Sequence, residues 1–450
     1  MKNNKLKCTT VGALASVAFC ANAAAQSSGA LLDKLVQKGI LTAQEAKDLR
    51  QDAQKDFDKG YAARSGLGPW VTSLKFNGDF RARYDGAFQD QSNAGPGNAT
   101  EDRHRFRYRV RFGATVEMSD HFEIGLRLGS GEVGSAAPSL GGSPFSANTT
   151  MNNDASRKFI FVDLAYAKWK PTDWFSADVG KMNNALWFTD MVMDPDYNPE
   201  GAQQKITLAL NQNQKISFTS GEFAILENYN GTGTGFNNDT YLFMGQLDWS
   251  AKWTDKLSSR IAVAGYAFAN QNATSASISA PAASTTTLES FINQNGTPAF
   301  GPGSQNFNPI IVRGEVTCNL ASFPLFDGAF PITLGAEYAN NPGAHSLPAG
   351  DQAYNFGVTF GNSRKKGNWQ LSYNYKNIGT ASVWHGINDD DFGFNAKGGT
   401  DVRGHQAIAS YRVFDPMTFN LRFMRTEQIN NAPGTSARQT RLFADLLWAF

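Results

Sequence analysis

The sequence predicts an all-β fold, a transmembrane antiparallel β-barrel of sixteen strands behind a short N-terminal helical segment. Three observations support this prediction. Beyond residue 70, polar and apolar side chains alternate with a period of two, over segments of about 10–14 residues where strands usually have about 5–6. The connections between these segments are alternately short and long, and the chain ends in an apolar strand, RLFADLLWAF. This combination is typical of barrels that cross a membrane.

Composition narrows the class of protein. Hydrophobic residues make up 41% of the 450 residues, and no stretch beyond residue 25 contains the 18 or more apolar residues of a spanning helix. Aromatic residues (12%) and 43 glycines suit strands, tight turns and interfacial girdles. Because 41 basic residues nearly balance 40 acidic ones, a nucleic-acid partner is not expected.

Residues 1–25 have the pattern of a secretory signal peptide. Three lysines in the first seven residues precede an apolar run over residues 11–19 and then small residues, so we expect cleavage before Gln26. Two of the three cysteines lie in this segment. Only Cys318 remains in the mature chain, which excludes a disulfide framework and a thiolate metal site.

Residues 26–66 differ from the rest of the chain because their apolar residues follow helical spacing. Leu32, Leu35 and Val36 lie on one helical face, and Thr42 with Glu45 forms a capping box that opens a second helix. We expect a periplasmic helical hairpin, which either spaces the barrel from the periplasm or associates with itself or the cell wall. The barrel is then expected over residues 67–450.

The alternation predicts sixteen strands. They lie near residues 71–84, 103–118, 120–130, 156–170, 173–184, 203–211, 214–227, 239–253, 256–270, 308–320, 330–340, 352–362, 367–378, 402–413, 416–428 and 438–450. Their short connections contain turn residues such as Ser119-Asp120, and the long ones span residues 86–101, 131–155, 185–202, 228–238, 271–307, 341–351, 379–401 and 429–437. Short periplasmic turns and long extracellular loops characterise outer-membrane barrels.

The segment RHRFRYRVRF carries an arginine at every second position. On a strand these arginines share one face and the apolar residues share the other. An arginine that faces lipid costs about 2–4 kcal/mol at the bilayer midplane, so we expect the arginines to face the lumen. The predicted pore-lining basic residues are Arg81, Arg83, Arg103, Arg105, Arg107, Arg109 and Arg111.

Such a column of like charges needs counter-charge. Residues 183–202 contain four acidic residues and no basic one, and we expect this loop to supply the counter-charge through Asp190, Asp194, Asp196 and Glu200. No metal site is predicted there, because the segment lacks the twelve-residue Ca²⁺ loop with its central glycine. The acidic run at residues 389–391 is expected to be solvated, or less often to bridge lipopolysaccharide through divalent ions.

This layout, an acidic third long loop with a basic ladder opposite, resembles the sixteen-stranded porins of Gram-negative bacteria. The phrases GKMNN, TDMVMDPDYNPEG and LLDKLVQKGILTAQEA further resemble a porin family with a helical N-terminal segment. The resemblance implies an outer-membrane protein whose third loop folds into the barrel and narrows it, and a homotrimer. The final strand, ending in Phe450, resembles the signal that the barrel-assembly machinery reads.

The function expected from these features is passive diffusion of small hydrophilic solutes through a water-filled channel. The ladder either stiffens the wall or creates a transverse field that favours anions. The alternatives are a substrate-specific channel for an anion such as phosphate or an organic acid, and a structural or adhesion barrel that uses residues 271–307. No cofactor is expected, and five scattered histidines without a catalytic motif predict no enzyme and no catalytic residue.

Overall fold

The computed structural model covers the whole chain and describes residues 68–92, 102–132, 142–152, 154–226, 239–269, 307–344, 350–393, 399–430 and 436–450, with parts of 32–52. The chain divides into two compact units, residues 1–73 and 74–450. The expected signal peptide lies outside the described residues.

In the first unit, residues 34–37 and 44–49 are helical. The N–H of Thr42 donates to Glu45 Oε2 (2.8 Å), and the N–H of Glu45 donates to Thr42 Oγ1 (3.2 Å). These reciprocal bonds confirm the predicted capping box, in which each side chain satisfies a backbone donor of the first helical turn. Among the described residues, no helix is both long and apolar enough to cross a membrane.

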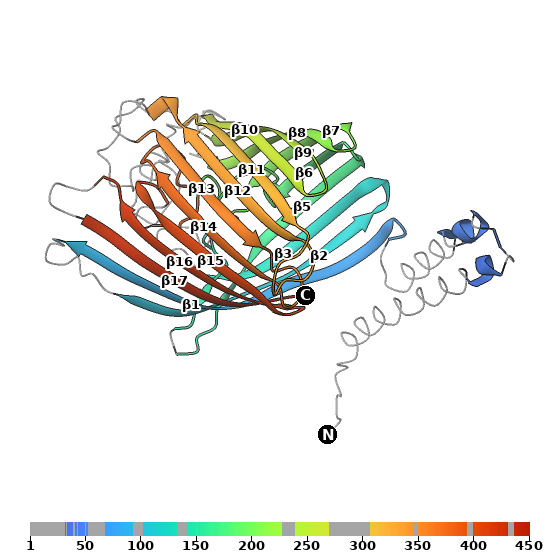
Figure 1. Cartoon of the computed structure of the whole chain (residues 1–450), viewed down its shortest axis with the longest axis horizontal. Helices are drawn as coiled ribbons and strands as arrows, with labels where there is room; N and C mark the ends of the chain where they lie inside the picture. The colour runs from blue at the N-terminus through green and yellow to red at the C-terminus, as the bar shows by residue number, and fades with distance from the viewer. Residues whose placement is uncertain are drawn as a thin grey trace, which may run out of the picture. The chain divides into compact units, whose positions relative to one another are not determined.

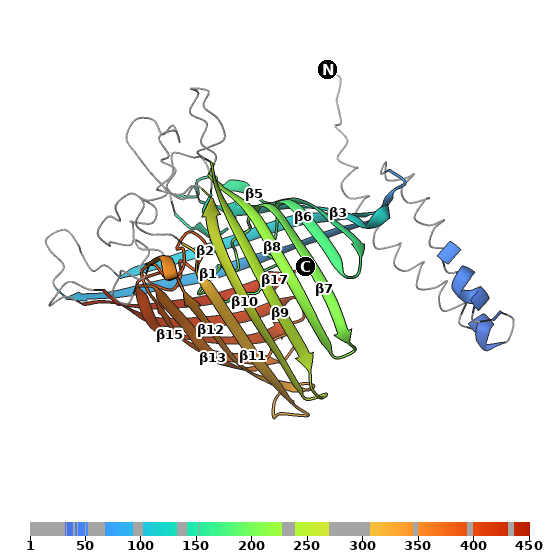
Figure 2. The ribbon, with the colours of Figure 1, turned by 90° about the horizontal axis from the view of Figure 1, so that it is seen from above.

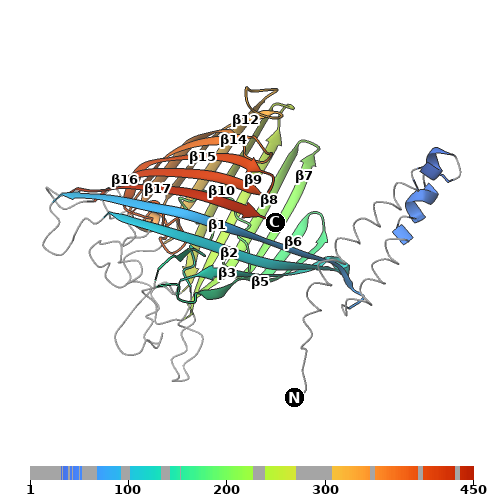
Figure 3. The ribbon, with the colours of Figure 1, turned by 90° about the horizontal axis from the view of Figure 1, so that it is seen from below.

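The second unit is a closed antiparallel β-barrel of sixteen long strands and one two-residue strand (Figures 1 and 3). The strands are β1 (Val71–Ser92), β2 (Arg103–Met118), β3 (Phe122–Gly131), β4 (Thr149–Thr150), β5 (Phe159–Thr172), β6 (Phe175–Lys181), β7 (Glu200–Asn211), β8 (Gln214–Leu226), β9 (Thr240–Lys252), β10 (Leu257–Ala269), β11 (Ile310–Leu320), β12 (Phe330–Asn340), β13 (Gln352–Gly361), β14 (Trp369–Ile378), β15 (Val402–Phe414), β16 (Met417–Gln428) and β17 (Ser436–Ala449).

Consecutive long strands pair in sequence order, as Figure 2 shows for β8, β9, β10 and β11. The last strand, β17, returns to pair with β1 from Asp79↔Ala449 to Ser92↔Ser436, and this pairing closes the barrel (Figure 3). Closure leaves no unpaired strand edge, which a membrane-spanning sheet requires. The predicted all-β barrel of sixteen strands is therefore confirmed; β1 extends further, to Ser92, and β6 ends earlier, at Lys181.

The two faces of the wall differ as the alternation predicts. On β2, Phe106 is 62% exposed and Phe112 48%, whereas Arg107 and Arg109 between them are 8% and 5% exposed. The aromatic side chains form a band on the outside of the barrel, and the arginines point inward. A water-soluble protein rarely exposes so extensive an apolar surface, so this outer face fits the hydrocarbon of a bilayer.

The inside of the barrel contains an apolar core formed by wall side chains and two loops. Loop L3 (residues 182–199, between β6 and β7) and loop L7 (residues 379–401, between β14 and β15) both contribute fully buried side chains, Met191 and Val192 from L3 and Ile387 and Phe392 from L7. The N–H of Asp194 donates to the carbonyl of Ile387 (2.7 Å). The described part of L7 is therefore packed against L3 rather than spread in solvent.

This packing corrects one expectation from the sequence. The acidic run at residues 389–391 was expected to be solvated, but Asp389 is only 5% exposed. The run is drawn inward because it lies between the buried side chains of Ile387 and Phe392 on the same loop.

Candidate pore constriction

Loop L3 leaves the wall at a pair of facing glycines. Gly180 on β6 and Gly201 on β7 pair with each other, and both have positive φ, +115° and +148°. A Cβ at Gly201 would lie 2.1 Å from the carbonyl oxygen of Glu222, so no other residue fits without a shift of the backbone. Immediately beyond, the N–H of Met182 donates to the carbonyl of Pro199 (3.0 Å), which holds the two ends of the loop together.

From this base L3 is held by the inner face of two strands across the barrel. The N–H of Trp187 donates to Gln246 Oε1 on β9 (2.7 Å), and the N–H of Thr189 donates to Glu337 Oε1 on β12 (3.1 Å). The guanidinium groups of Arg260 on β10 and Arg313 on β11 lie 4.0 and 3.9 Å from the centre of a Trp187 ring. These contacts are cation–π interactions.

L3 also contacts strands on two other sides of the barrel. Asp190 pairs with Lys376 Nζ on β14 (2.6 Å), and this lysine is fully buried. Asp196 Oδ1 accepts from Arg109 (3.2 Å) and Arg111 (3.4 Å) on β2. A loop that starts between β6 and β7 and reaches β2, β9, β12 and β14 must cross the interior of the barrel.

The arginine ladder is balanced mainly by carboxylates of the barrel wall. Arg109 Nε and Arg111 Nε donate to the two oxygens of Asp79, at 2.9 and 2.7 Å. Asp85 accepts a hydrogen bond from Arg105, and its Oδ2 lies 3.6 Å from Arg107 Nη1. Loop L3 therefore contacts two arginines of the ladder, Arg109 and Arg111, whereas Arg105 and Arg107 pair with Asp85 of the wall.

The two arginines predicted to join the ladder from β1 have other partners. Arg81 donates to Asn148 Oδ1 (2.7 Å), while Arg83 forms a bidentate pair with Asp445 on β17 (2.7 and 2.9 Å). Arg83 also lies 3.6 Å from Asp391 of L7. The remaining predicted residue, Arg103, lies at the start of β2 and is exposed.

The four predicted acidic residues separate into different environments. Of these four, only Asp196 contacts the ladder. Burial of its carboxyl would raise the pKa of Asp196, but the positive charges of Arg109 and the neighbouring arginines outweigh burial and lower this pKa. Asp190 pairs with Lys376, and Glu200 begins β7 and pairs with Lys181 (2.9 Å). Asp194 faces L7.

L7 supplies an acidic contact that the sequence did not reveal. Asp391 lies 3.0 Å from Arg441, 3.6 Å from Arg83 and 3.8 Å from Arg422. Burial alone would raise the pKa of Asp391, but these guanidinium groups lower it well below the usual range. One sequence signal could have indicated this contact, namely the apolar residues of L7. A solvated loop rarely contains a segment such as VWHGI (residues 383–387) followed closely by Phe392.

A group of carboxylates lies where the two loops meet. Asp194, Asp389 and Asp390 each offer an oxygen within 4.8 Å of the others. Burial, and then repulsion between the carboxylates, raises the pKa of Asp389 to about 6, of Asp390 to about 7 and of Asp194 to about 10. The spacing of their oxygens would also suit a metal ion.

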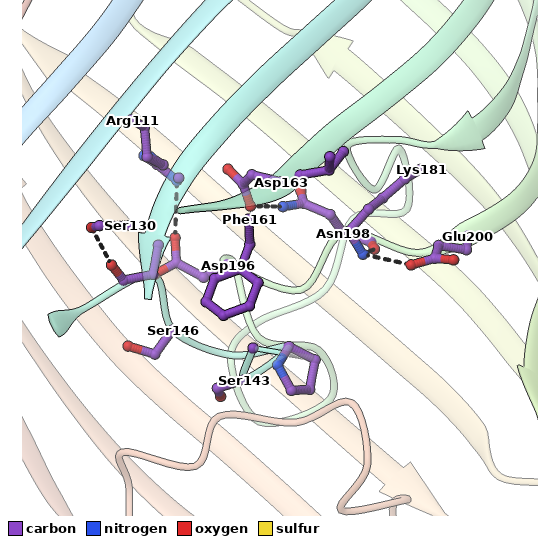
Figure 4. A pocket seen from close by; sticks show the side chains of 15 residues that line it. Arg111, Ser130, Ser143, Ser146, Phe161, Asp163, Lys181, Asp196, Asn198 and Glu200 are labelled. Carbon is purple, nitrogen blue, oxygen red and sulfur yellow. Dashed lines mark hydrogen bonds and ion pairs between the residues drawn. The ribbon is translucent and has the colours of Figure 1, made fainter. Parts of the chain in front are cut away.

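A polar cavity of about 330 Å³ lies beside the contact between L3 and the ladder (Figure 4). Figure 4 shows Arg111 directed toward Asp196, and Lys181 directed toward Glu200. Across the cavity, Asn198 donates to Asp163 Oδ1 (3.0 Å). Its lining therefore presents two cations and several carboxylates to any solute that enters.

A closed barrel with an apolar outer face and a charged loop across its interior defines the class of outer-membrane channel proteins. The family model described as "Putative porin" matches residues 95–307 and 335–440, which is more than half of the chain. The chain therefore belongs to this porin family, a family of channel proteins and not of enzymes.

Comparison with solved structures finds further barrels. A triple mutant of the Rhodopseudomonas blastica porin and a mutant of the same porin with five substitutions each have 10% sequence identity and a TM-score of 0.40. Each match covers 84% of this chain and 100% of that chain. A structure described as "Asymmetric conductivity of engineered proteins" matches with the same values. No curated protein matches the chain.

Proposed function

We propose that the protein is a passive diffusion channel for small hydrophilic solutes, narrowed by loop L3 and the arginine ladder. The observation that carries this proposal is the crossing of the lumen by L3, from its glycine base to the pair of Arg109 and Arg111 with Asp196. A loop fixed at several points on the inner wall would reduce the open cross-section and leave a charged passage beside it.

The charges around this passage favour anions. Nine arginines lie on the ladder or contact its partners, namely Arg81, Arg83, Arg103, Arg105, Arg107, Arg109, Arg111, Arg422 and Arg441. Six carboxylates pair with them, namely Asp79, Asp85, Glu132, Asp196, Asp391 and Asp445. The difference, nine minus six, leaves an excess of positive charge, which a narrow pore with low-dielectric walls would amplify.

Single-channel recording in planar bilayers tests this function. The purified protein should produce discrete conductance steps, and its reversal potential in a salt gradient should indicate a preference for anions. A correctly folded protein that produces no steps would refute the channel, and a preference for cations would refute the role given to the ladder.

A second candidate is a channel specific for an anion such as phosphate or an organic acid. It rests on the cavity of about 330 Å³ lined by Arg111 and Lys181, where a bound anion would have to compete with the carboxylates that pair with these two cations, Asp196 and Glu200. A specific channel would saturate, so conductance carried by the anion should level off at millimolar concentration, whereas passive diffusion rises in proportion. The adhesion alternative stays a prediction, since residues 271–306 lie outside the described residues.

The membrane topology follows from the same proposal. We infer that residues 1–25 are removed as a signal peptide, that the remaining N-terminal segment is periplasmic, and that the long loops face outward. Phe450 would be read by the barrel-assembly machinery, and the mature protein would form a homotrimer. N-terminal sequencing of the mature protein, together with cross-linking of purified membranes, tests the cleavage site and the trimer.

A further inference from the structure

Three arginines face away from the barrel at the ends of β15, β16 and β17 that the long loops join. Arg403, Arg425 and Arg438 alternate with buried residues on their strands, and the side chains of Arg403 and Arg438 are 47% and 50% exposed. The register places Arg403 opposite Glu427, and Glu427 opposite Arg438. We call these three residues the outer arginine patch.

The patch is unusual for an outer wall. On β8 to β14 the outward positions carry no lysine or arginine, and near the same end they carry side chains such as Tyr241, Ile310 and Tyr338. An outward arginine costs about 2–4 kcal/mol at the midplane but about 0–1 kcal/mol near the interface. The patch lies at the strand ends, so it belongs to the headgroup region and not to the hydrocarbon.

The patch has more cationic than anionic charge. Glu427 pairs with Arg403 (2.6 Å) and Arg438 (3.4 Å), and the register places Asp90 of β1 opposite Arg438. Within the described part of the chain, Arg425 donates to the neutral hydroxyl of Thr440 (2.9 Å). Three guanidinium groups against two carboxylates leave one positive charge, and the guanidinium of Arg425 keeps donors for a further ligand.

A groove of about 450 Å³ runs between these side chains. Gly404 lies on its floor, where a Cβ would stand 2.2 Å from the carbonyl oxygen of Arg425, so the floor is bare backbone. Tyr375 and His405 line the side of the groove that faces β14. The groove is therefore cationic and open outward, with donors converging on it from three strands.

Apolar side chains continue directly below the groove toward the middle of the membrane. Two residues along β16 from Arg425, Phe423 stands opposite Leu442 on β17 and Ala407 on β15, and Ala407 stands opposite Tyr373 on β14. A cationic groove above an apolar surface matches a lipid that carries phosphate on its headgroup and acyl chains below it.

We propose that the outer arginine patch binds a phosphate group of an anionic glycolipid of the outer leaflet, of the lipid A type. Arg425 donates to the phosphate, with Arg403 and Arg438 on either side, and the acyl chains lie over Phe423 and Leu442. Guanidinium groups suit phosphate because their parallel N–H donors match its oxygens. This site is independent of the proposed channel function, since every residue in it faces away from the lumen.

Native mass spectrometry of the full mature chain tests the site. The protein is titrated with bisphosphorylated lipid A, with dephosphorylated lipid A and with inorganic phosphate, and compared with the triple variant Arg403→Gln/Arg425→Gln/Arg438→Gln. We expect the triple variant to bind bisphosphorylated lipid A about tenfold more weakly, from the loss of charge-assisted hydrogen bonds. Dephosphorylated lipid A should bind both proteins equally weakly, and millimolar inorganic phosphate should not displace the lipid.

The matched control changes three cations at the opposite end of the barrel, Arg364→Gln/Lys365→Gln/Lys366→Gln in the exposed turn before β14. It should bind lipid A as the unmodified protein does. The variant Arg425→Lys keeps the charge and the fold but loses the guanidinium fork, and it should fall between the two. Heat-modifiable gel mobility establishes that each variant is folded.

Four results would overturn the proposal. They are equal binding of bisphosphorylated lipid A by the triple variant and the unmodified protein, equal binding of the dephosphorylated lipid by the unmodified protein, and complete displacement by millimolar phosphate, which would identify a site for the free ion. The fourth is a change in the number of subunits with unchanged lipid binding, which would identify the patch as a contact between copies of this chain.

Discussion

Loops L3 and L7 both fold into the barrel, but they are held there in different ways. L3 is attached to the wall by hydrogen bonds and ion pairs, of Trp187 with β9, of Asp190 with β14 and of Asp196 with β2. L7 is held mainly by apolar packing, with Ile387 and Phe392 fully buried, and in its described part the ion pairs with the wall come from one residue, Asp391. The difference indicates that the wall positions L3 and that L3, in turn, forms much of the surface on which L7 packs.

One residue of the wall contacts both loops. The ammonium group of Lys376 pairs with Asp190 of L3 (2.6 Å) and lies 4.5 Å from the centre of the Phe392 ring of L7. Its side chain is fully buried. Substitutions of Lys376 and of its two partners, Asp190 in L3 and Phe392 in L7, can therefore distinguish how each loop is held.

The largest effect is expected from Lys376→Met, which leaves Asp190 without its cation in a buried site. Breaking a buried ion pair in this way costs about 3–5 kcal/mol, because the remaining charge stays desolvated. Urea unfolding in lipid vesicles measures the loss. The double variant Lys376→Met/Asp190→Asn removes both charges and should recover most of the stability; if it is as unstable as the single variant, the ion pair is not what anchors L3.

A comparable but more local loss is expected from Phe392→Ala. Removal of a buried phenylalanine side chain typically costs about 3–5 kcal/mol, and at a lumen loop that can rearrange we expect the lower end of this range. Since L3 retains its attachments to the wall, hydrogen exchange should increase in L7 and change little in residues 182–190. An equal increase in both loops would contradict the order of dependence described above.

The ladder is expected to influence ion selection more than stability. In Arg107→Gln/Arg109→Gln/Arg111→Gln, three positive charges are lost and Asp79 and Asp196 lose their partners, so the passage beside L3 becomes more negative. Reversal potentials should shift toward cations. Arg364→Gln, in the turn before β14 away from L3, serves as the control and should leave the potential unchanged; an unchanged potential in the triple variant would refute the field argument.

The strands could be predicted from sequence because the signals for each strand, its alternating side chains and the turn residues at its ends, lie within or next to that strand. The same alternation indicates which face of β2 holds the arginines. The partners could not be predicted in this way: Asp79 and Asp85 of β1, the main counter-charge of the ladder, were not among the predicted site residues. L7 was missed for the same reason, since the burial of Asp389 depends on L3, which is distant in the chain.

The smallest effect concerns pH and the contact between the loops. Burial and mutual repulsion raise the pKa of Asp389 to about 6 and of Asp390 to about 7, while Asp194 remains protonated with a pKa of about 10. The charged groups around them are Asp190 and Lys376, paired with each other, and Asp391 with Arg422 and Arg441.

Because the folded-state pKa values are raised, the folded contact binds more protons than separated loops do. Its stabilisation is complete at low pH, and it is lost as the pH rises through about 6 to 7. Hydrogen exchange in residues 191–194 and 387–391 should therefore increase between pH 5 and pH 8, beyond the intrinsic dependence of exchange on pH. In the triple variant Asp194→Asn/Asp389→Asn/Asp390→Asn, which also removes the raised pKa of Asp194, the residual dependence should be nearly flat. If that variant keeps the full pH response, the carboxylates between L3 and L7 are not its source, and the contact between the loops is set by apolar packing alone.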